Sequence, residues 1–498
     1  MKNKFFNILK LENKFLKKFI FYGFSTIFFK FLSFIIFPLH LSILDPIYFG
    51  KINEIYSYIA FFQILYCFGI DSCIFRFSHL KNYINFAKTF TIFFSFILSF
   101  FLYVIFKSSI VFQNYICESN FILCLLILIF DSILVVFLSQ VRDSCQDSFF
   151  VRVKLIQATI FFILNILLYF FSKNVLNQDS IIKIIFTINL LSNFLASIYL
   201  IFKKKISFFF SKRFLKISFF YSLPFFYSNL AFFLNDILIK TLFRFGINDQ
   251  NIDKSNFYNL GTFLACQKLS VFMNVIIQIY KITVEPFFLK KNFDKNSYEK
   301  NIFWFSIIGA FFVFFISSNV NILSFFLFKD KNYIKYTDCI SIFLFSNLIN
   351  GISYNFSLWM KVKNKIKPIL FLSTVLVFSN LLFSSVLLKI IPHYASSLSI
   401  LISNLINCFI SLYIIKKNGF EIKFGFIFSF IFSIFLISLF FSKKNYQKID
   451  LSFTQSLLQL SINSFISVII FIIAIIYFIL SEKYKKINLE IISKKNIN

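Results

Sequence analysis

The sequence predicts an all-α polytopic membrane protein of about fourteen transmembrane helices, with two six-helix lobes around a central cavity plus two C-terminal helices. Composition supports this class, because 58% of the 498 residues are hydrophobic, 22% are aromatic and the mean hydropathy is +0.80. The apolar residues form runs of roughly 20, enough to cross a hydrocarbon core of about 30 Å as helices. These runs are continuous, whereas barrel strands would alternate apolar and polar residues, so helices are expected.

Fourteen runs can be drawn along the chain. The boundary between the eleventh and twelfth depends on Pro392 and His393, and twelve or thirteen spans are the alternatives. The runs are 19–39, 55–75, 86–106, 121–138, 155–171, 181–202, 217–239, 258–279, 302–328, 339–360, 369–388, 395–415, 422–441 and 456–480.

Positive charge predicts the orientation of these spans. The chain has 51 Lys and Arg residues, of which Lys30 and Lys268 lie inside predicted spans. A lysine within one turn of a span end is counted with the neighbouring loop. On this count the two tails and every second loop hold 35 of these residues. The remaining loops hold 14. Loops rich in Lys and Arg stay on the cytoplasmic side, so both termini are predicted to be cytoplasmic. The basic residues are spread over many short loops, which excludes a nucleic-acid footprint.

The basic run KKKISFFFSKRFLK divides the spans. We expect an N-terminal six-helix lobe at 1–202, a basic cytoplasmic linker at 203–216, a C-terminal six-helix lobe at 217–415, and an extra helix pair with a cytoplasmic tail at 416–498. Six spans return the chain to its starting side, so the two lobes are expected to be parallel repeats, although no residue-level repeat supports this.

Two lysines lie near the middle of predicted spans. Lys30 is about ten residues from either end of the first span and shares a helix face with Gly23, Thr26 and Ser33. Lys268 is placed similarly in the eighth span. A central lysine costs roughly 2.5 to 3.5 kcal/mol on insertion scales, so a compensating partner is expected. The pair predicts a cationic site suited to phosphate. The alternative is that Lys30 forms an ion pair with Asp71 or Asp131 that only joins helices.

Three carboxylates, Asp71, Asp131 and Asp236, lie within predicted spans. Each could carry a coupling proton or cation, or neutralise a lysine. Asp236 and Lys240 have the i, i+4 spacing of a local pair. Glu285 followed by Pro286 predicts the end of the eighth span, because the residue before a proline disfavours the helical conformation.

Several stretches resemble bacterial polysaccharide flippases of the multidrug, oligosaccharidyl-lipid and polysaccharide exporter superfamily. They are LSILDPIYFG after the first span, GIDSCIFRF in the second, QVRDSCQDSFFVRVKLIQ before the fifth and ITVEPFF in the eighth. The residues that match the motifs are Leu44, Pro46 and Gly50; Gly69, Asp71, Ser72, Arg76 and Phe77; and Glu285, Pro286 and Phe287. Related lipid II flippases use arginines in the first and eighth spans, where this chain has Lys30 and Lys268.

The resemblance implies a flippase that moves a polyprenyl-pyrophosphate-linked oligosaccharide across the bacterial cytoplasmic (inner) membrane by alternating access, for lipopolysaccharide or other surface polysaccharide. Lys30 and Lys268 would bind the pyrophosphate. Expected partners are the lipid-linked oligosaccharide, membrane lipids, a coupling cation or proton and a polysaccharide polymerase. No enzyme, catalytic residue or cofactor is expected.

Three other functions fit parts of the sequence. A cation-coupled drug antiporter of the same superfamily is the nearest alternative, because of the span carboxylates. A membrane glycosyltransferase or polymerase would need a sizeable outer loop, and no loop exceeds roughly 20 residues. A proton-pumping subunit would need a regular series of mid-helix Lys and Glu residues. No metal site is expected, because His40, His79 and His393 each lie near a span end without a nearby CxxC.

Overall fold

The structure, a computed structural model, describes most of the chain between residues 34 and 419. Some side chains within helices are also left out. The described residues are 28, 32, 34–109, 116–144, 146–172, 177–204, 207–246, 254–290, 295–328, 336–363, 365–419 and 463.

Every labelled element in the described residues is an α-helix. A short helix, Phe34–Ile43, precedes them. The labelled helices are α2 (Pro46–Cys67), α3 (Ile70–Phe77), α4 (Tyr83–Ser108), α6 (Glu118–Asp143), α7 (Asp147–Ser172), α8 (Gln178–Lys204), α9 (Lys212–Gly246), α10 (Lys254–Lys290), α11 (Lys295–Ser318), α12 (Val320–Leu327), α13 (Cys339–Val362), α14 (Ile366–Ile390) and α15 (Ala395–Lys417).

The chain is a multi-pass membrane protein. Within the described residues, ten helical segments are long and apolar enough to cross a membrane. The predicted count of fourteen is therefore reached only in part. The last two predicted spans and most of the first lie outside the described residues, and the seventh corresponds to α9, which is a described helix but not among these ten. Exposed phenylalanines such as Phe96, Phe100 and Phe101 line α4, as expected of a lipid-facing surface.

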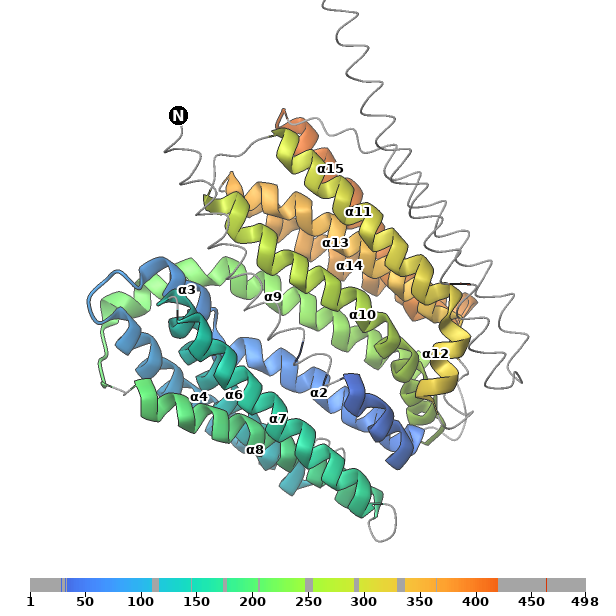
Figure 1. The fold of residues 1–498 in the computed structure, drawn as a ribbon, viewed down its shortest axis with the longest axis horizontal. Helices are drawn as coiled ribbons and strands as arrows, with labels where there is room; N and C mark the ends of the chain where they lie inside the picture. The colour runs from blue at the N-terminus through green and yellow to red at the C-terminus, as the bar shows by residue number, and fades with distance from the viewer. Residues whose placement is uncertain are drawn as a thin grey trace, which may run out of the picture.

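The helices form two groups (Figure 1). The N-terminal bundle consists of α2, α3, α4, α6, α7 and α8, and the C-terminal bundle consists of α9 to α15. Helix α13 is buried at the centre of the C-terminal bundle and packs against α10, α11 and α15. The two bundles meet where α9 and α10 pack against α2.

Helix breaks occur where the sequence disfavours a continuous helix. The second predicted span is interrupted at Phe68 and Gly69, which both have left-handed backbone conformations with φ of 44° and 68°. Pro392 lies in the turn between α14 and α15, so the predicted boundary between the eleventh and twelfth spans is confirmed. The ninth predicted span is divided at Asn319, between α11 and α12.

The segment that joins the bundles is attached to the N-terminal bundle by polar contacts. Lys88 of α4 donates to the carbonyl of Lys204 at the end of α8, at 3.0 Å. Thr89 donates to the carbonyl of Phe209 at 2.6 Å. Helix α9 begins at Lys212, so it includes the last part of the predicted linker.

Candidate functional site

A close contact between the bundles lies at the start of α2. A Cβ atom added at Gly261 of α10 would be 1.8 Å from the carbonyl oxygen of Pro46 and 3.1 Å from the amide nitrogen of Gly50. These neighbours are backbone atoms, so only a residue without a side chain allows α10 to lie this close to α2. Gly261 is therefore a point where α10 packs directly against the backbone of α2.

Lys268 lies two turns further along α10, between the two bundles. Its ammonium group is 4.9 Å from the ring centre of Phe49 in α2 and 5.5 Å from that of Phe37 in the first helix. A desolvated cation over an aromatic face gains about 2 kcal/mol, which offsets part of its insertion cost. No carboxylate in the described residues forms a salt bridge with Lys268.

A second lysine, which the sequence analysis placed in a local pair, reaches the same region. Lys240 of α9 donates to the hydroxyl of Ser57 in α2. It is close enough to Lys268 for the two positive charges to interact electrostatically. Glu54, one turn before Ser57, is also buried at this contact face. The site is thus built from three helices, α2, α9 and α10, which belong to both bundles.

The remaining residue of the predicted pyrophosphate site, Lys30, lies outside the described residues. Phe34, one turn later in the sequence, packs against Phe272 of α10 with ring centres 4.2 Å apart. His40, at the end of this first helix, is 2.7 Å from the amide oxygen of Asn165 in α7. The first helix therefore contacts both bundles.

Asp71 and Asp131, two of the three carboxylates predicted to lie in spans, belong to a different region, inside the N-terminal bundle. Asp131 of α6 interacts electrostatically with Lys154 of α7, and Asp71 at the start of α3 interacts with Arg142 of α6. Both carboxylates lie near Cys67. The alternative hypothesis of a Lys30 pair with Asp71 or Asp131 is not tested, but each carboxylate has a cation within its own bundle.

A polar chain extends from this region towards α8. The Lys154 ammonium group donates to Gln157 at 3.0 Å, and the amide of Gln157 donates to Asn193 at 2.6 Å. Gln157 and Asn193 are both buried. The sequence analysis assigned Lys154 to a loop, whereas α7 begins at Asp147 and carries Lys154 into the bundle.

The motif residues have structural roles where their side chains are described. Gly69 has a φ of 68°, and a Cβ there would approach the Cβ of Ser222 in α9 to 3.0 Å, so this glycine allows the break after α2 to pack against α9. Arg76 is exposed at the end of α3. Gly69 therefore marks a second close contact between the bundles.

Two further predictions concern residues of α9 and α10. The predicted helix stop at Glu285 and Pro286 is wrong, because α10 continues to Lys290. The apolar segment of this helix ends at Gln278, which agrees with the predicted span 258–279. Neighbouring helices and local adjustments can satisfy the backbone groups that a proline leaves unpaired in a membrane helix. Asp236 lies in α9, but its side chain, like those of Glu285 and Pro286, is outside the described set, so its pairing with Lys240 stays a prediction.

Comparison with solved structures shows that this chain has the fold of MOP superfamily transporters. The lipid II flippase MurJ in an inward closed conformation matches with a TM-score of 0.63 at 16% identity, over 91% of this chain and 98% of that one. A MOP superfamily transporter from Pyrococcus furiosus matches with a TM-score of 0.61 at 11% identity, over 81% and 95%.

An inward-facing multidrug resistance transporter of the MATE family matches with a TM-score of 0.59 at 12% identity, over 78% of this chain and 94% of that one. No protein-family model and no curated protein matches the sequence. At these identities the likeness shows the fold alone.

Proposed function

We propose that this protein flips a polyprenyl-pyrophosphate-linked oligosaccharide across the bacterial cytoplasmic membrane by alternating access, for assembly of a cell-surface polysaccharide. The observation that supports this most is the position of Lys268 and Lys240. They lie on different helices of one bundle and both reach α2 of the other. The likeness to a lipid II flippase supports the same class of substrate.

Two positive charges close together inside a membrane protein favour an anionic ligand, because the ligand removes their mutual repulsion and part of their desolvation cost. Pyrophosphate fits this requirement, and lysine binds phosphate as a point charge. The rings of Phe37 and Phe49 beside Lys268 hold the ammonium group between the bundles. Lys30 would add a third cation, while the polyprenyl tail stays in lipid.

The proposed transport cycle moves the bundles relative to each other around this site. In the present structure the bundles are in contact where Gly261 meets Pro46. This end is the outer end in the orientation that positive charge predicts, with both termini cytoplasmic. Asp71, Asp131 and Asp236 are the proposed coupling or charge-balancing groups for a proton or cation. A polysaccharide polymerase is the proposed downstream partner.

The test is transbilayer movement of a fluorescent polyprenyl-pyrophosphate oligosaccharide in proteoliposomes. A Lys240→Ala, Lys268→Ala variant is expected to flip the lipid about tenfold or more slowly, since each lost charged contact corresponds to about 1.5 kcal/mol or more. A Lys30→Ala, Lys268→Ala variant tests the pair that the sequence predicts. Lys281→Ala is the matched control, because Lys281 lies on the same helix but faces Tyr354 inside the C-terminal bundle, at 4.4 Å from its ring centre.

If the lysine variants and the control all flip at the rate of the unchanged protein, the cationic site is not the substrate site. A cation-coupled antiporter is the second candidate, favoured by the likeness to MATE family transporters and by Asp131 inside the N-terminal bundle. It would move a cationic drug against a proton or sodium gradient, and Asp131→Asn would abolish this transport while Lys268→Ala would not.

A further inference from the structure

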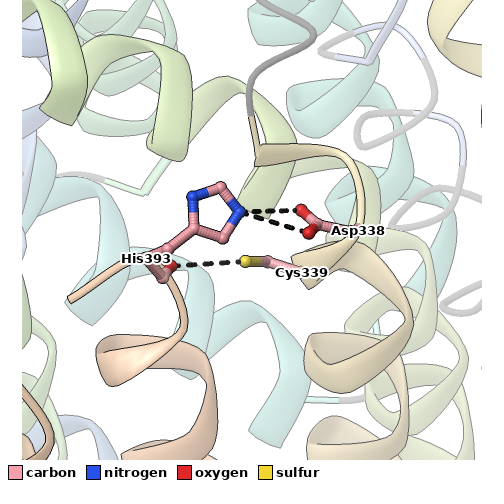
Figure 2. Close-up of side chains that lie close together, drawn as sticks. All are labelled: Asp338, Cys339 and His393. Atoms are coloured by element: carbon pink, nitrogen blue, oxygen red, sulfur yellow. Dashed lines mark hydrogen bonds and ion pairs between the residues drawn. The ribbon is translucent and has the colours of Figure 1, made fainter. Parts of the chain in front are cut away.

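Three potential metal ligands from distant parts of the sequence meet at one end of the C-terminal bundle (Figure 2). Nε2 of His393 is 3.1 and 3.2 Å from the two carboxylate oxygens of Asp338. The Cys339 thiol donates to the carbonyl oxygen of His393 at 3.6 Å. One ligand atom from each residue lies within 4.8 Å of the others. In the described part of the chain, no other three His, Cys, Asp or Glu side chains are this close.

The local backbone explains why these groups converge. Asp338 is the N-cap residue of α13 and Cys339 is its first residue. The partial positive charge at a helix N-terminus favours both a carboxylate and a thiolate. His393 lies in the turn between α14 and α15, directly after Pro392, where the chain reverses beside the start of α13.

Neighbouring aromatic residues fix the orientation of two of the three side chains. The hydroxyl of Tyr394 donates to the Asp338 carboxylate. The ring of Tyr336 stacks on the His393 imidazole with centres 4.7 Å apart. Burial alone would raise the pKa of Asp338, but hydrogen bonds from His393 and Tyr394 outweigh it and lower the pKa below its usual value. Metal ligands are typically held by such outer contacts.

We propose that Asp338, Cys339 and His393 bind a divalent transition-metal ion of the zinc type, with water as the fourth ligand. At bond lengths of about 2.0 to 2.1 Å, a nitrogen and an oxygen bound to one tetrahedral zinc lie about 3.3 Å apart. The His393 nitrogen and the Asp338 oxygens are already near this separation. In the same complex the Cys339 sulfur would lie about 3.5 Å from the nitrogen and oxygen. The three ligand atoms now lie within 4.8 Å of one another, so the sulfur must approach the other two by about 1 Å when the metal binds.

The charges of this site balance when the metal binds. The Cys339 S–H bond breaks, its proton passes to solvent, and a sulfur–metal bond replaces one metal–water bond. The proton that His393 Nε2 donates to Asp338 moves through solvent to Nδ1, so that a nitrogen–metal bond can replace a second metal–water bond. Thiolate and carboxylate together then neutralise a divalent cation, while the imidazole binds as a neutral ligand. A thiolate with an imidazole favours zinc over magnesium or calcium. The Asp338 and His393 side chains are 28% and 35% exposed, which gives the ion a path from solvent.

The bound metal would join the start of α13 to the turn between α14 and α15. Its position places it at the end of the bundle that is predicted to face outwards, so the ion would come from outside the cell. The proposed lipid-linked substrate has no part in this site, and the metal-site proposal stands independently of the proposed function.

Cobalt(II) is a suitable probe, because a thiolate–cobalt bond gives a charge-transfer absorption that cobalt bound only to nitrogen and oxygen lacks. The full-length protein, purified in detergent without a histidine tag and stripped with a chelator, is titrated with cobalt(II). We expect a saturable band at one equivalent that zinc(II) removes. Cys339→Ser should abolish the band, and His393→Gln should keep the thiolate but weaken binding about tenfold or more. Cys117→Ser, which changes an exposed cysteine elsewhere, is the matched control and should titrate like the unchanged protein.

Circular dichroism and gel filtration of each variant establish that it is folded. If Cys339→Ser does not fold, His393→Gln alone tests the site, because it retains both anionic ligands. A thermal melt gives a second measurement, since zinc that binds only the folded state raises the melting temperature of the unchanged protein. The proposal is overturned if the unchanged protein shows no saturable band, or if the band persists in Cys339→Ser or has the same affinity in His393→Gln.

Discussion

A single added methyl group at Gly261 should separate the two bundles at the start of α2. In Gly261→Ala the new Cβ would lie 1.8 Å from the Pro46 carbonyl oxygen, whereas ordinary contact begins at about 3.4 Å. The helices must therefore move apart by about 1.6 Å, because no side chain can rotate to relieve a clash with backbone. Overpacking of this kind typically costs about 1 to 3 kcal/mol.

This cost applies only to the conformation in which α2 and α10 touch at this end. A shift of about 1 to 3 kcal/mol corresponds to about a 5- to 150-fold change in a two-state equilibrium. Gly261→Ala should therefore populate the conformation that is open at this end. Double electron–electron resonance between nitroxides on Asp45→Cys and Lys389→Cys, in a Cys117→Ser background, would show a longer mean distance.

Gly309→Ala is the matched control, because its Cβ would meet the ends of the Leu348 and Met273 side chains inside the C-terminal bundle. These flexible groups can move, so the distance between the labels should stay that of the unchanged protein. The reasoning is refuted if Gly261→Ala gives the same distance distribution as Gly309→Ala.

Three further predictions concern stability, measured as thermal melting of the purified protein. Gly69→Ala should lower stability by about 1 kcal/mol or more, since alanine disfavours a positive φ. Adding Ser222→Gly should restore only the part of this loss that comes from contact of the new Cβ with α9. Full restoration would show that the positive φ of residue 69 costs nothing. Lys88→Met should cost about 1 to 3 kcal/mol, because the buried ammonium group bonds the end of α8; an unchanged melting point would show that the bond contributes nothing. Lys154→Met should cost about 3 kcal/mol by leaving the Asp131 charge without its cation, and Asp131→Asn in the same chain should recover most of this loss.

The sequence was sufficient to predict a helical membrane protein, because each span must satisfy its backbone hydrogen bonds internally and therefore appears as one apolar run. It also predicted the break at Pro392, between α14 and α15. It could not place Lys154 inside a bundle, because charged residues at a span end look like loop residues. It also predicted a helix stop at Pro286, whereas α10 continues to Lys290, because the surrounding helices matter more than the local preference.

Contacts between residues far apart in the sequence could not be predicted for a different reason. Lys240 and Ser57 are 183 residues apart, and Cys339 and His393 are 54 apart, so neither contact leaves a local pattern. From the sequence, Lys240 is predicted to pair with Asp236, four residues earlier on the same helix. Only the packing of α9 against α2 directs it towards Lys268 and the site between the bundles.

The distribution of glycine supports a moving contact along α2. Only 9 of the 498 residues are glycine, well below the average share of about 7%. Two of them lie at opposite ends of the contact between the bundles: Gly261 against the start of α2, and Gly69 directly after its end, against α9. The contacts of Lys268 with Phe49 and of Lys240 with Ser57 fall between these two points. A rotation that separates one close contact while keeping the other would expose the lysines to one side of the membrane at a time, which is the requirement for alternating access.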